Sequence, residues 1–268
     1  RVKEKVLIIP RIYTNKPRTS GTGYKGMLHQ PDPTEMPNIV EGIKAIRRMH
    51  LRAISVSHLT SADEMLYPTN YPYLEDILSY VAIGARSVEN QSHRLTVSGL
   101  NIPVGMKNPT SGDIEVMLNS ILAAQNSHVF IYNEWEVETS GNKYAHAVLR
   151  GSVNFQGQHF PNYHYEDLNR VLHAYKKRDL ANPAIIIDTN HSNSAKNYKE
   201  QPRIVREVLA NTRFNDDLKK VIKGFMVESY LLEGAQDYTG TDYGRSITDP
   251  CLGWDDTFKL IMDIAELR

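Results

Sequence analysis

The sequence contains very little cysteine and no long apolar run. Its 268 residues include a single cysteine, Cys251, so no internal disulfide can form and a reducing, cytoplasmic location is expected. No stretch of about 18 apolar residues occurs, so no transmembrane helix is predicted. The opening residues RVKEKVLIIPRIY differ from a signal peptide, because the apolar stretch is short and is interrupted by Arg11.

The chain also lacks an excess of charge of either sign. Lys plus Arg number 31 and Asp plus Glu number 31, which gives a formal net charge of zero. Nothing in the overall charge attracts nucleic acid or an anionic membrane, and neither is expected as a partner. No repeat or linker divides the sequence, so residues 1–268 are predicted to form one large domain.

Short apolar runs alternate with helical patterns along the chain. The clearest run, AIIID at 184–188, leads into a polar cluster with His191 and is typical of a strand buried on both faces. This alternation predicts a parallel α/β fold. Residues 128–140 are predicted as an inserted hairpin. Other strands are predicted over 6–13, 61–66, 81–86, 102–108, 145–150 and 224–229, and helices over 38–55, 72–80, 114–124, 165–175 and 202–210 and at the C-terminus.

Charged residues stand where these predicted strands end. In a parallel barrel such ends converge on one face, where clustered cations favour a bound phosphate or carboxylate. The loop after the first predicted strand carries Lys16 and Arg18 beside several glycines. These residues would suit a bound anion, but a solvated basic loop without a ligand explains them equally well. The strand-end residues are Arg11, Arg86, Lys107, Arg150, His191 and Glu228.

One histidine and two carboxylates follow the later strands. His191, Glu228 and Asp249 offer one nitrogen and two oxygen donors, a combination that suits Mn²⁺, Fe²⁺ or Zn²⁺. The simpler alternatives are that His191 only forms hydrogen bonds within its loop and that the charged strand ends form scattered salt bridges.

Seven ordered motifs resemble the type I 3-deoxy-D-arabino-heptulosonate-7-phosphate (DAHP) synthases. The resemblance runs from near Arg1 to the C-terminus. It implies a (β/α)8 TIM barrel and a transferase that condenses phosphoenolpyruvate with erythrose 4-phosphate and water, the first step of the shikimate pathway and of aromatic amino acid biosynthesis. The motifs are KPRT (16–19), GARSVENQSHR (84–94), KNPTSGD (107–113), LRG (149–151), IDTNHSNSAK (187–196), VESYLLEGAQ (227–236) and GRSITDPCLGWDDT (244–257).

The resemblance also implies roles for individual residues. The phosphoenolpyruvate site would comprise Arg11, Lys16, Gly84, Ala85, Arg86, Lys107 and Arg150. The erythrose 4-phosphate loop would comprise Pro17, Arg18 and Thr19, and the metal ligands would be His191, Glu228 and Asp249. Lys16, Glu64 and His191 are the expected catalytic residues, with Lys16 protonating the new alkoxide and Glu64 acting on the attacking water. Mn²⁺ is the expected cofactor, with Fe²⁺, Co²⁺ or Zn²⁺ as alternatives.

One family feature has no counterpart in the printed sequence. The family's first barrel strand and a metal-binding cysteine after it would precede Arg1, and Cys251 is not expected to replace that ligand. An open barrel leaves strand edges unpaired, so this chain alone is expected to be poorly stable or inactive. The alternatives are a segment missing from the sequence, a contribution from another chain, or an inactive relative that serves as a regulatory or binding protein.

The family likeness also implies partners. A homodimer or homotetramer is expected, and the hairpin over 128–140 would contribute to a site for an inhibitory aromatic amino acid. A related barrel enzyme, 3-deoxy-D-manno-octulosonate-8-phosphate synthase, is the other enzyme considered. The KPRT motif and the length of the match favour DAHP synthase.

Overall fold

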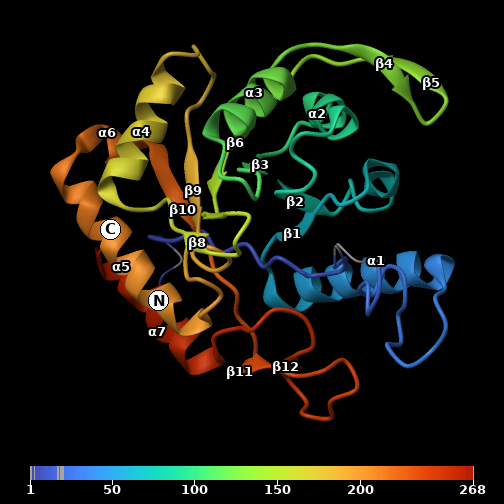
Figure 1. Ribbon diagram of the computed structural model, residues 1–268. Helices are drawn as coiled ribbons and strands as arrows, with labels where there is room; N and C mark the ends of the chain where they lie inside the picture. The colour runs from blue at the N-terminus through green and yellow to red at the C-terminus, as the bar shows by residue number, and fades with distance from the viewer. Residues whose placement is uncertain (1, 3, 17, 19–20, 268) are drawn as a thin grey trace.

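The structure is built on one curled sheet of parallel strands. The computed structural model describes residues 2, 4–16, 18 and 21–267. Its six-stranded sheet has the order β1-β2-β3-β6-β9-β10, and it curves into a half-barrel (Figure 1). All neighbouring strands in it are parallel. The strands are β1 (Ser61–Glu64), β2 (Leu78–Ile83), β3 (Val104–Lys107), β6 (Ala145–Leu149), β9 (Ile185–Asp188) and β10 (Ile222–Met226).

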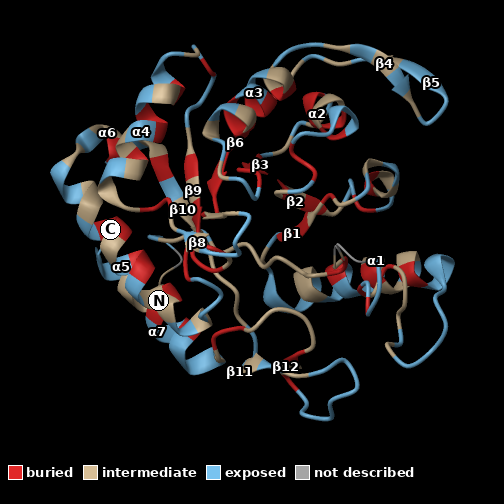
Figure 2. Cartoon of the chain, in the orientation of Figure 1, coloured by how far each residue is buried: buried red, intermediate tan, exposed pale blue. Residues whose placement is uncertain are grey.

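Helices lie between these strands in the chain and pack against the outside of the sheet. All residues of β3 and β6 are buried, as expected for strands covered on both faces (Figure 2). In the described part of the chain, no helix is both long and apolar enough to cross a membrane. The α-helices are α1 (Ile39–Ser57), α2 (Gln91–Ser98), α3 (Ile114–Gln125), α4 (Tyr165–Lys176), α5 (Gln201–Asn211), α6 (Asp216–Val221) and α7 (Trp254–Leu267). Short 3-10 helices span Pro68–Tyr73, Tyr198–Glu200 and Thr212–Phe214.

Three small strand pairs lie outside the main sheet. The strands predicted over 128–132 and 136–139 form an antiparallel pair, β4 (Val129–Tyr132) and β5 (Trp135–Glu138), which projects away from the sheet (Figure 1). The other pairs are β7 (Ser152–Val153) with β8 (His159–Phe160), and β11 (Leu232–Ala235) with β12 (Arg245–Ser246).

The strand predicted over 6–13 is wrong in its extent. Only Arg11 forms a bridge, with Ala62 of β1, supported by hydrogen bonds from Ile12 N to Ala62 O (3.0 Å) and from Ala62 N to Pro10 O (2.9 Å). Pro10 has no N–H group and cannot donate to a ladder. The apolar composition of this segment therefore predicted a longer strand than its backbone can form.

The helical prediction over 72–80 is also wrong. A 3-10 helix ends at Tyr73 and β2 already begins at Leu78. Pro72 lies inside that short helix and limits its regular hydrogen bonding. Helices α2 and α6 were not predicted from the sequence, and they have only eight and six residues. Such short helices carry too few periodic positions to stand out.

The interior of the half-barrel contains a tyrosine–histidine pair in which His146 is buried and Tyr80 is partly buried. Tyr80 Oη lies 2.9 Å from His146 Nε2, and His146 Nδ1 lies 2.8 Å from the carbonyl oxygen of Tyr144. Because a carbonyl only accepts, Nδ1 carries the proton and Nε2 accepts from the tyrosine hydroxyl. The pair leaves no room beside β3. A Cβ atom at Gly105 would overlap Tyr80 Oη and would lie 2.7 Å from Val148 Cγ2.

We predict that Gly105→Ala destabilises the fold by about 1–3 kcal/mol, because the added methyl group overpacks a closed interior. The matched control is Gly224→Ala in β10, where the new Cβ would meet only Ile186 Cδ1 at 3.5 Å. This control should change stability by less than about 1 kcal/mol. Urea denaturation of both variants measures the difference, and equal free energies of unfolding would contradict the assignment.

Candidate active site

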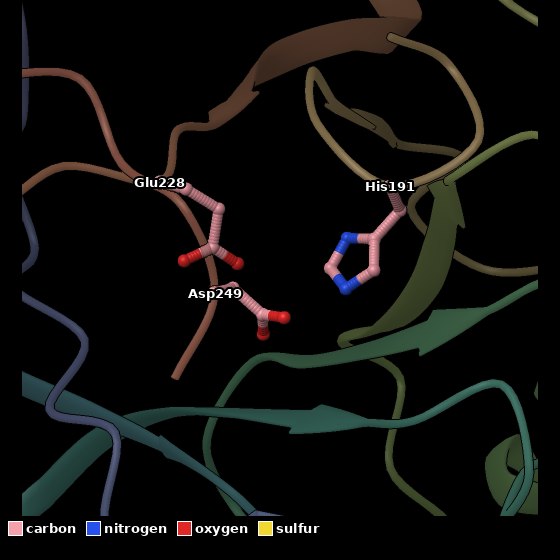
Figure 3. A group of neighbouring side chains, drawn as sticks. All are labelled: His191, Glu228 and Asp249. Carbon is pink, nitrogen blue, oxygen red and sulfur yellow. The ribbon is translucent and has the colours of Figure 1, made fainter. Parts of the chain in front are cut away.

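Three potential metal ligands converge beyond the carboxyl ends of the strands. His191 follows β9, Glu228 follows β10, and Asp249 follows β12. Figure 3 shows their side chains pointing toward one another, and one donor atom from each lies within 4.8 Å of the others. All three are partly buried. A nitrogen and two carboxylate oxygens at this spacing fit a divalent metal ion.

His191 has an unusual backbone and a charged neighbour. Its φ of 46° is left-handed, a conformation that favours glycine and strains other residues. Its Nδ1 atom lies 2.8 Å from Asp188 Oδ2, although the ring nitrogen is not aligned for a hydrogen bond. Asp188 therefore lies where a carboxylate can orient the ring, as carboxylates beside metal-binding histidines commonly do.

Asp188 also forms a buried ion pair with the candidate anion site. Its Oδ2 atom accepts a hydrogen bond from Lys107 Nζ at 2.8 Å, and the two side chains are 2% and 4% exposed. Burial opposes ionisation of this carboxyl, but the positive charges of His191 and Lys107 outweigh it and hold the pKa of Asp188 well below its usual value. One carboxylate thus links His191 to Lys107.

Two further cations of the predicted phosphoenolpyruvate site are paired with carboxylates. Lys16 Nζ donates to Asp249 Oδ2 at 2.5 Å, and Arg11 Nη2 donates to Glu64 Oε2 at 2.8 Å. Burial opposes ionisation of Asp249, yet Lys16 lowers the pKa of its carboxyl. Burial likewise opposes ionisation of Arg11, but nearby groups raise its pKa, and Glu64 has the largest effect among them.

Buried guanidinium nitrogens point to an anion at this site. Arg11 Nε and Arg150 Nη1 are buried and have no hydrogen-bond partner among the described residues. Burial and the nearby charge of Arg86 lower the pKa of Arg150, whereas Asp188 and Glu64 act to raise it. An unsatisfied buried donor is costly, so the oxygens of a bound anion would stabilise this arrangement.

Gly84 leaves room for the Glu64 carboxylate where β2 ends. A Cβ atom at Gly84 would overlap the Glu64 carboxylate, so the residue lets that side chain lie against the backbone. Ala85 follows as a partly buried residue, and Arg86 is exposed. The end of β2 therefore places Gly84, Ala85 and Arg86 next to Glu64.

A network of buried asparagines, which was not predicted from the sequence, fixes the strand ends. Asn108 Oδ1 accepts from Arg150 N at 2.9 Å and from Asn162 Nδ2 at 3.1 Å. Asn193 Nδ2 donates to Leu149 O at 3.1 Å and to Asp188 O at 2.8 Å. The only sequence signal was the position of Asn108, directly after a strand-ending lysine.

The predicted site residues fall into three groups in the structure. The arrangement brings most of them into linked contacts or charge interactions, with Ala85 lying in the chain between two of these residues: Arg11, Lys16, Glu64, Gly84, Arg86, Lys107, Arg150, His191, Glu228 and Asp249. Arg18 lies against its own loop, with Nε donating to Tyr24 O at 2.8 Å. Pro17 and Thr19 lie outside the described residues.

Fold and site together define an α/β protein with a candidate metal centre beside a candidate anion site at the carboxyl ends of parallel strands. The model of the DAHP synthetase I family matches residues 1–261. The chain belongs to the DAHP synthetase I family.

This chain aligns with most of the length of individual relatives. A phospho-2-dehydro-3-deoxyheptonate aldolase of Haemophilus influenzae is 36% identical over 274 residues, covering 99% of this chain and 73% of the relative. The Phe-sensitive aldolase of Escherichia coli K12 is 38% identical over 273 residues, covering 98% and 74%. The structure of the aldolase from Francisella tularensis SCHU S4 has a TM-score of 0.90 and 32% identity, covering 99% of this chain and 76% of that one.

We predict that Asp188→Asn lowers the free energy of unfolding by about 3–5 kcal/mol, because it leaves Lys107 buried without its counter-charge. The control is Asp263→Asn, which removes a more exposed partner 2.5 Å from Arg206 and should cost at most about 1 kcal/mol. Urea denaturation in the presence of EDTA provides the measurement. A loss for Asp188→Asn no greater than that for Asp263→Asn would contradict the buried ion pair.

Proposed function

We propose that this chain is a DAHP synthase, which condenses phosphoenolpyruvate with erythrose 4-phosphate and water to give DAHP and phosphate. This is the first step of aromatic amino acid biosynthesis. The observation that carries the proposal is the position of the candidate metal ligands beside buried arginines with unsatisfied donors. One substrate is a phosphorylated carboxylate and the other is a phosphorylated aldehyde, so the reaction requires both features.

The anion site would bind phosphoenolpyruvate. Arg86, Lys107 and Arg150 supply positive charge for its phosphate and carboxylate, and the buried Arg150 Nη1 gains the acceptor it lacks. Charge-assisted hydrogen bonds from guanidinium groups are strong and directional. Arg11 lies near Glu64 and Glu228 and would close the site on the metal side. Ala85 and Gly84 would allow close approach of the substrate to the backbone.

His191, Glu228 and Asp249 would hold a divalent ion, with Mn²⁺ the proposed metal and Fe²⁺, Co²⁺ or Zn²⁺ as alternatives. When bound, this ion would supply Lewis-acid polarisation of the erythrose 4-phosphate aldehyde. Pro17, Arg18 and Thr19 are proposed to bind the phosphate of that substrate.

Lys16 and Glu64 are the proposed proton-transfer residues. The Lys16 ammonium lies against Asp249 and can donate a proton to the alkoxide that forms when carbon 3 of phosphoenolpyruvate attacks the aldehyde. Positive charge then develops at carbon 2, where water adds. Glu64 is held by Arg11 and is proposed to accept a proton from that water. Collapse of the resulting hemiketal phosphate gives the ketone and inorganic phosphate.

The half-barrel also supports a larger architecture. We infer that residues 1–268 form a single domain of the (β/α)8 barrel type that lacks its first strand in this chain, with segment 6–13 continuing the sheet beyond β1 through the bridge at Arg11. The β4–β5 hairpin is then an insertion in that barrel.

Homologous aldolases of E. coli are named Phe-sensitive and Trp-sensitive. By analogy, we propose inhibition by an aromatic amino acid and assembly into a homodimer or homotetramer.

We predict that phosphate release from phosphoenolpyruvate requires erythrose 4-phosphate and is abolished by EDTA and restored by Mn²⁺. Glu228→Gln should lower kcat/KM by more than about 100-fold, since even neighbours of metal ligands affect activity by about 10–100-fold. Glu233→Gln, at an exposed partner of Lys199, is the control and should retain activity. If neither this chain nor a version extended by the family's first strand and its cysteine releases phosphate with any of these metals, the protein is an inactive binding or regulatory relative.

We predict that Arg150→Met weakens phosphoenolpyruvate binding by about 10- to 150-fold, the equivalent of about 1.5–3 kcal/mol for a hydrogen bond to a charged group. Arg170→Met on α4, where the side chain is 67% exposed, is the control and should leave affinity unchanged. Titration calorimetry measures both affinities. The anion-site assignment fails if the two variants bind phosphoenolpyruvate equally well.

A further inference from the structure

A glutamine remote in sequence from the site is hydrogen-bonded to one of the candidate metal ligands. Gln201 is the first residue of α5 and is completely buried. Its Oε1 accepts from Glu228 N at 2.8 Å, and its Nε2 donates to Glu228 O at 3.0 Å. A backbone N–H needs an acceptor and a carbonyl needs a donor, so these partners fix the orientation of the amide.

The same amide contacts the strand that leads to His191. Gln201 Oε1 also accepts from Thr189 Oγ1 at 3.0 Å, and this hydroxyl lies 2.9 Å from Met226 O. Thr189 is two residues before His191 in the chain. A single side chain therefore connects the segments that follow β9 and β10.

The need for this connection comes from the end of the strand ladder. The last register pair between β9 and β10 is Asp188 with Met226, followed by a bond from Thr189 N to Met226 O at 3.0 Å. Beyond it the chain turns away at His191, whose φ is left-handed. Glu228 then has no partner from β9. Its carbonyl oxygen accepts from Leu252 N at 2.9 Å, while Gln201 supplies the acceptor for its N–H and a second donor to its carbonyl.

We propose that Gln201 is a positioning residue for the metal centre, holding the Glu228 backbone in register with the His191 loop. The inference rests on the proposed function, because it assumes that Glu228 and His191 bind metal. Gln201 itself touches neither metal nor substrate. It acts by fixing where the Glu228 side chain begins, and residues that orient metal ligands typically affect metal affinity by about 10–100-fold.

The chain contains a matched control for this role. Gln125, at the end of α3, also clamps backbone with both ends of its amide. Its Nε2 donates to Ala145 O at 3.1 Å and to Ala181 O at 3.0 Å, and its Oε1 accepts from Ala181 N at 2.8 Å. Ala145 begins β6, so Gln125 serves the amino end of the sheet, opposite to the site.

The test is the affinity for Mn²⁺ alone, measured by calorimetry or by electron paramagnetic resonance of free Mn²⁺ in the absence of substrates. Gln201→Met should raise the Kd for Mn²⁺ by about 10–100-fold. Gln125→Met should leave the Kd within about two-fold of wild type while losing the same kinds of hydrogen bond. Melting temperatures of the metal-free proteins show whether the two variants are comparably destabilised.

The outcomes separate this inference from the proposed function. Unchanged Mn²⁺ affinity in Gln201→Met, or equal weakening in both variants, would overturn the positioning role alone. Absence of Mn²⁺ binding by the wild-type chain would overturn the proposed metal centre and the role of Gln201 together. If Gln201→Met does not fold, Thr189→Val decides. This variant keeps Gln201 but removes the hydroxyl that joins it to the segment before His191, so several-fold weaker binding is expected and wild-type affinity would refute the proposal.

Discussion

The candidate site depends on one buried carboxylate that balances two groups. Asp188 is 2% exposed and lies 2.8 Å from both Lys107 Nζ and His191 Nδ1. Burying either ion alone would cost several kcal/mol, whereas the pair recovers much of that cost through short contacts. Because Asp188 is the last residue of β9, the sheet determines the position of the carboxylate, and the carboxylate in turn determines how far Lys107 lies from His191.

The pairing of buried cations with carboxylates also affects how ligands are expected to bind. Lys16 is paired with Asp249 and Arg11 with Glu64, so each cation already has a carboxylate partner. If Asp249 held a divalent ion, the Lys16 ammonium would be available to pair with an anionic substrate instead. Binding would then exchange one charge pair for another without leaving a bare buried charge.

Much of the fold followed from pattern, because strands covered on both faces are continuous apolar runs. The run at 184–188 predicted β9 to within one residue. The strand over 6–13 was overestimated because composition does not register the missing N–H of Pro10. The metal-ligand triad was predictable, since charged strand ends converge on one face. The roles of Gln201 and Asn193 could not be predicted, because these side chains bind backbone groups 27 and 44 residues away in the chain. In the sequence, an amide that binds buried backbone looks the same as an amide on the surface.

The tyrosine–histidine pair inside the half-barrel has a consequence for how this interior can vary. The Tyr80 hydroxyl occupies the space that a side chain on β3 would need, and His146 holds it there. The sizes of the residues at positions 80 and 105 therefore depend on each other. A relative with a larger residue at position 105 needs a smaller one at position 80 together with a small shift of Val148, and a change at either position alone leaves a void or a clash. Substitutions at the two positions are accordingly expected to accumulate in pairs.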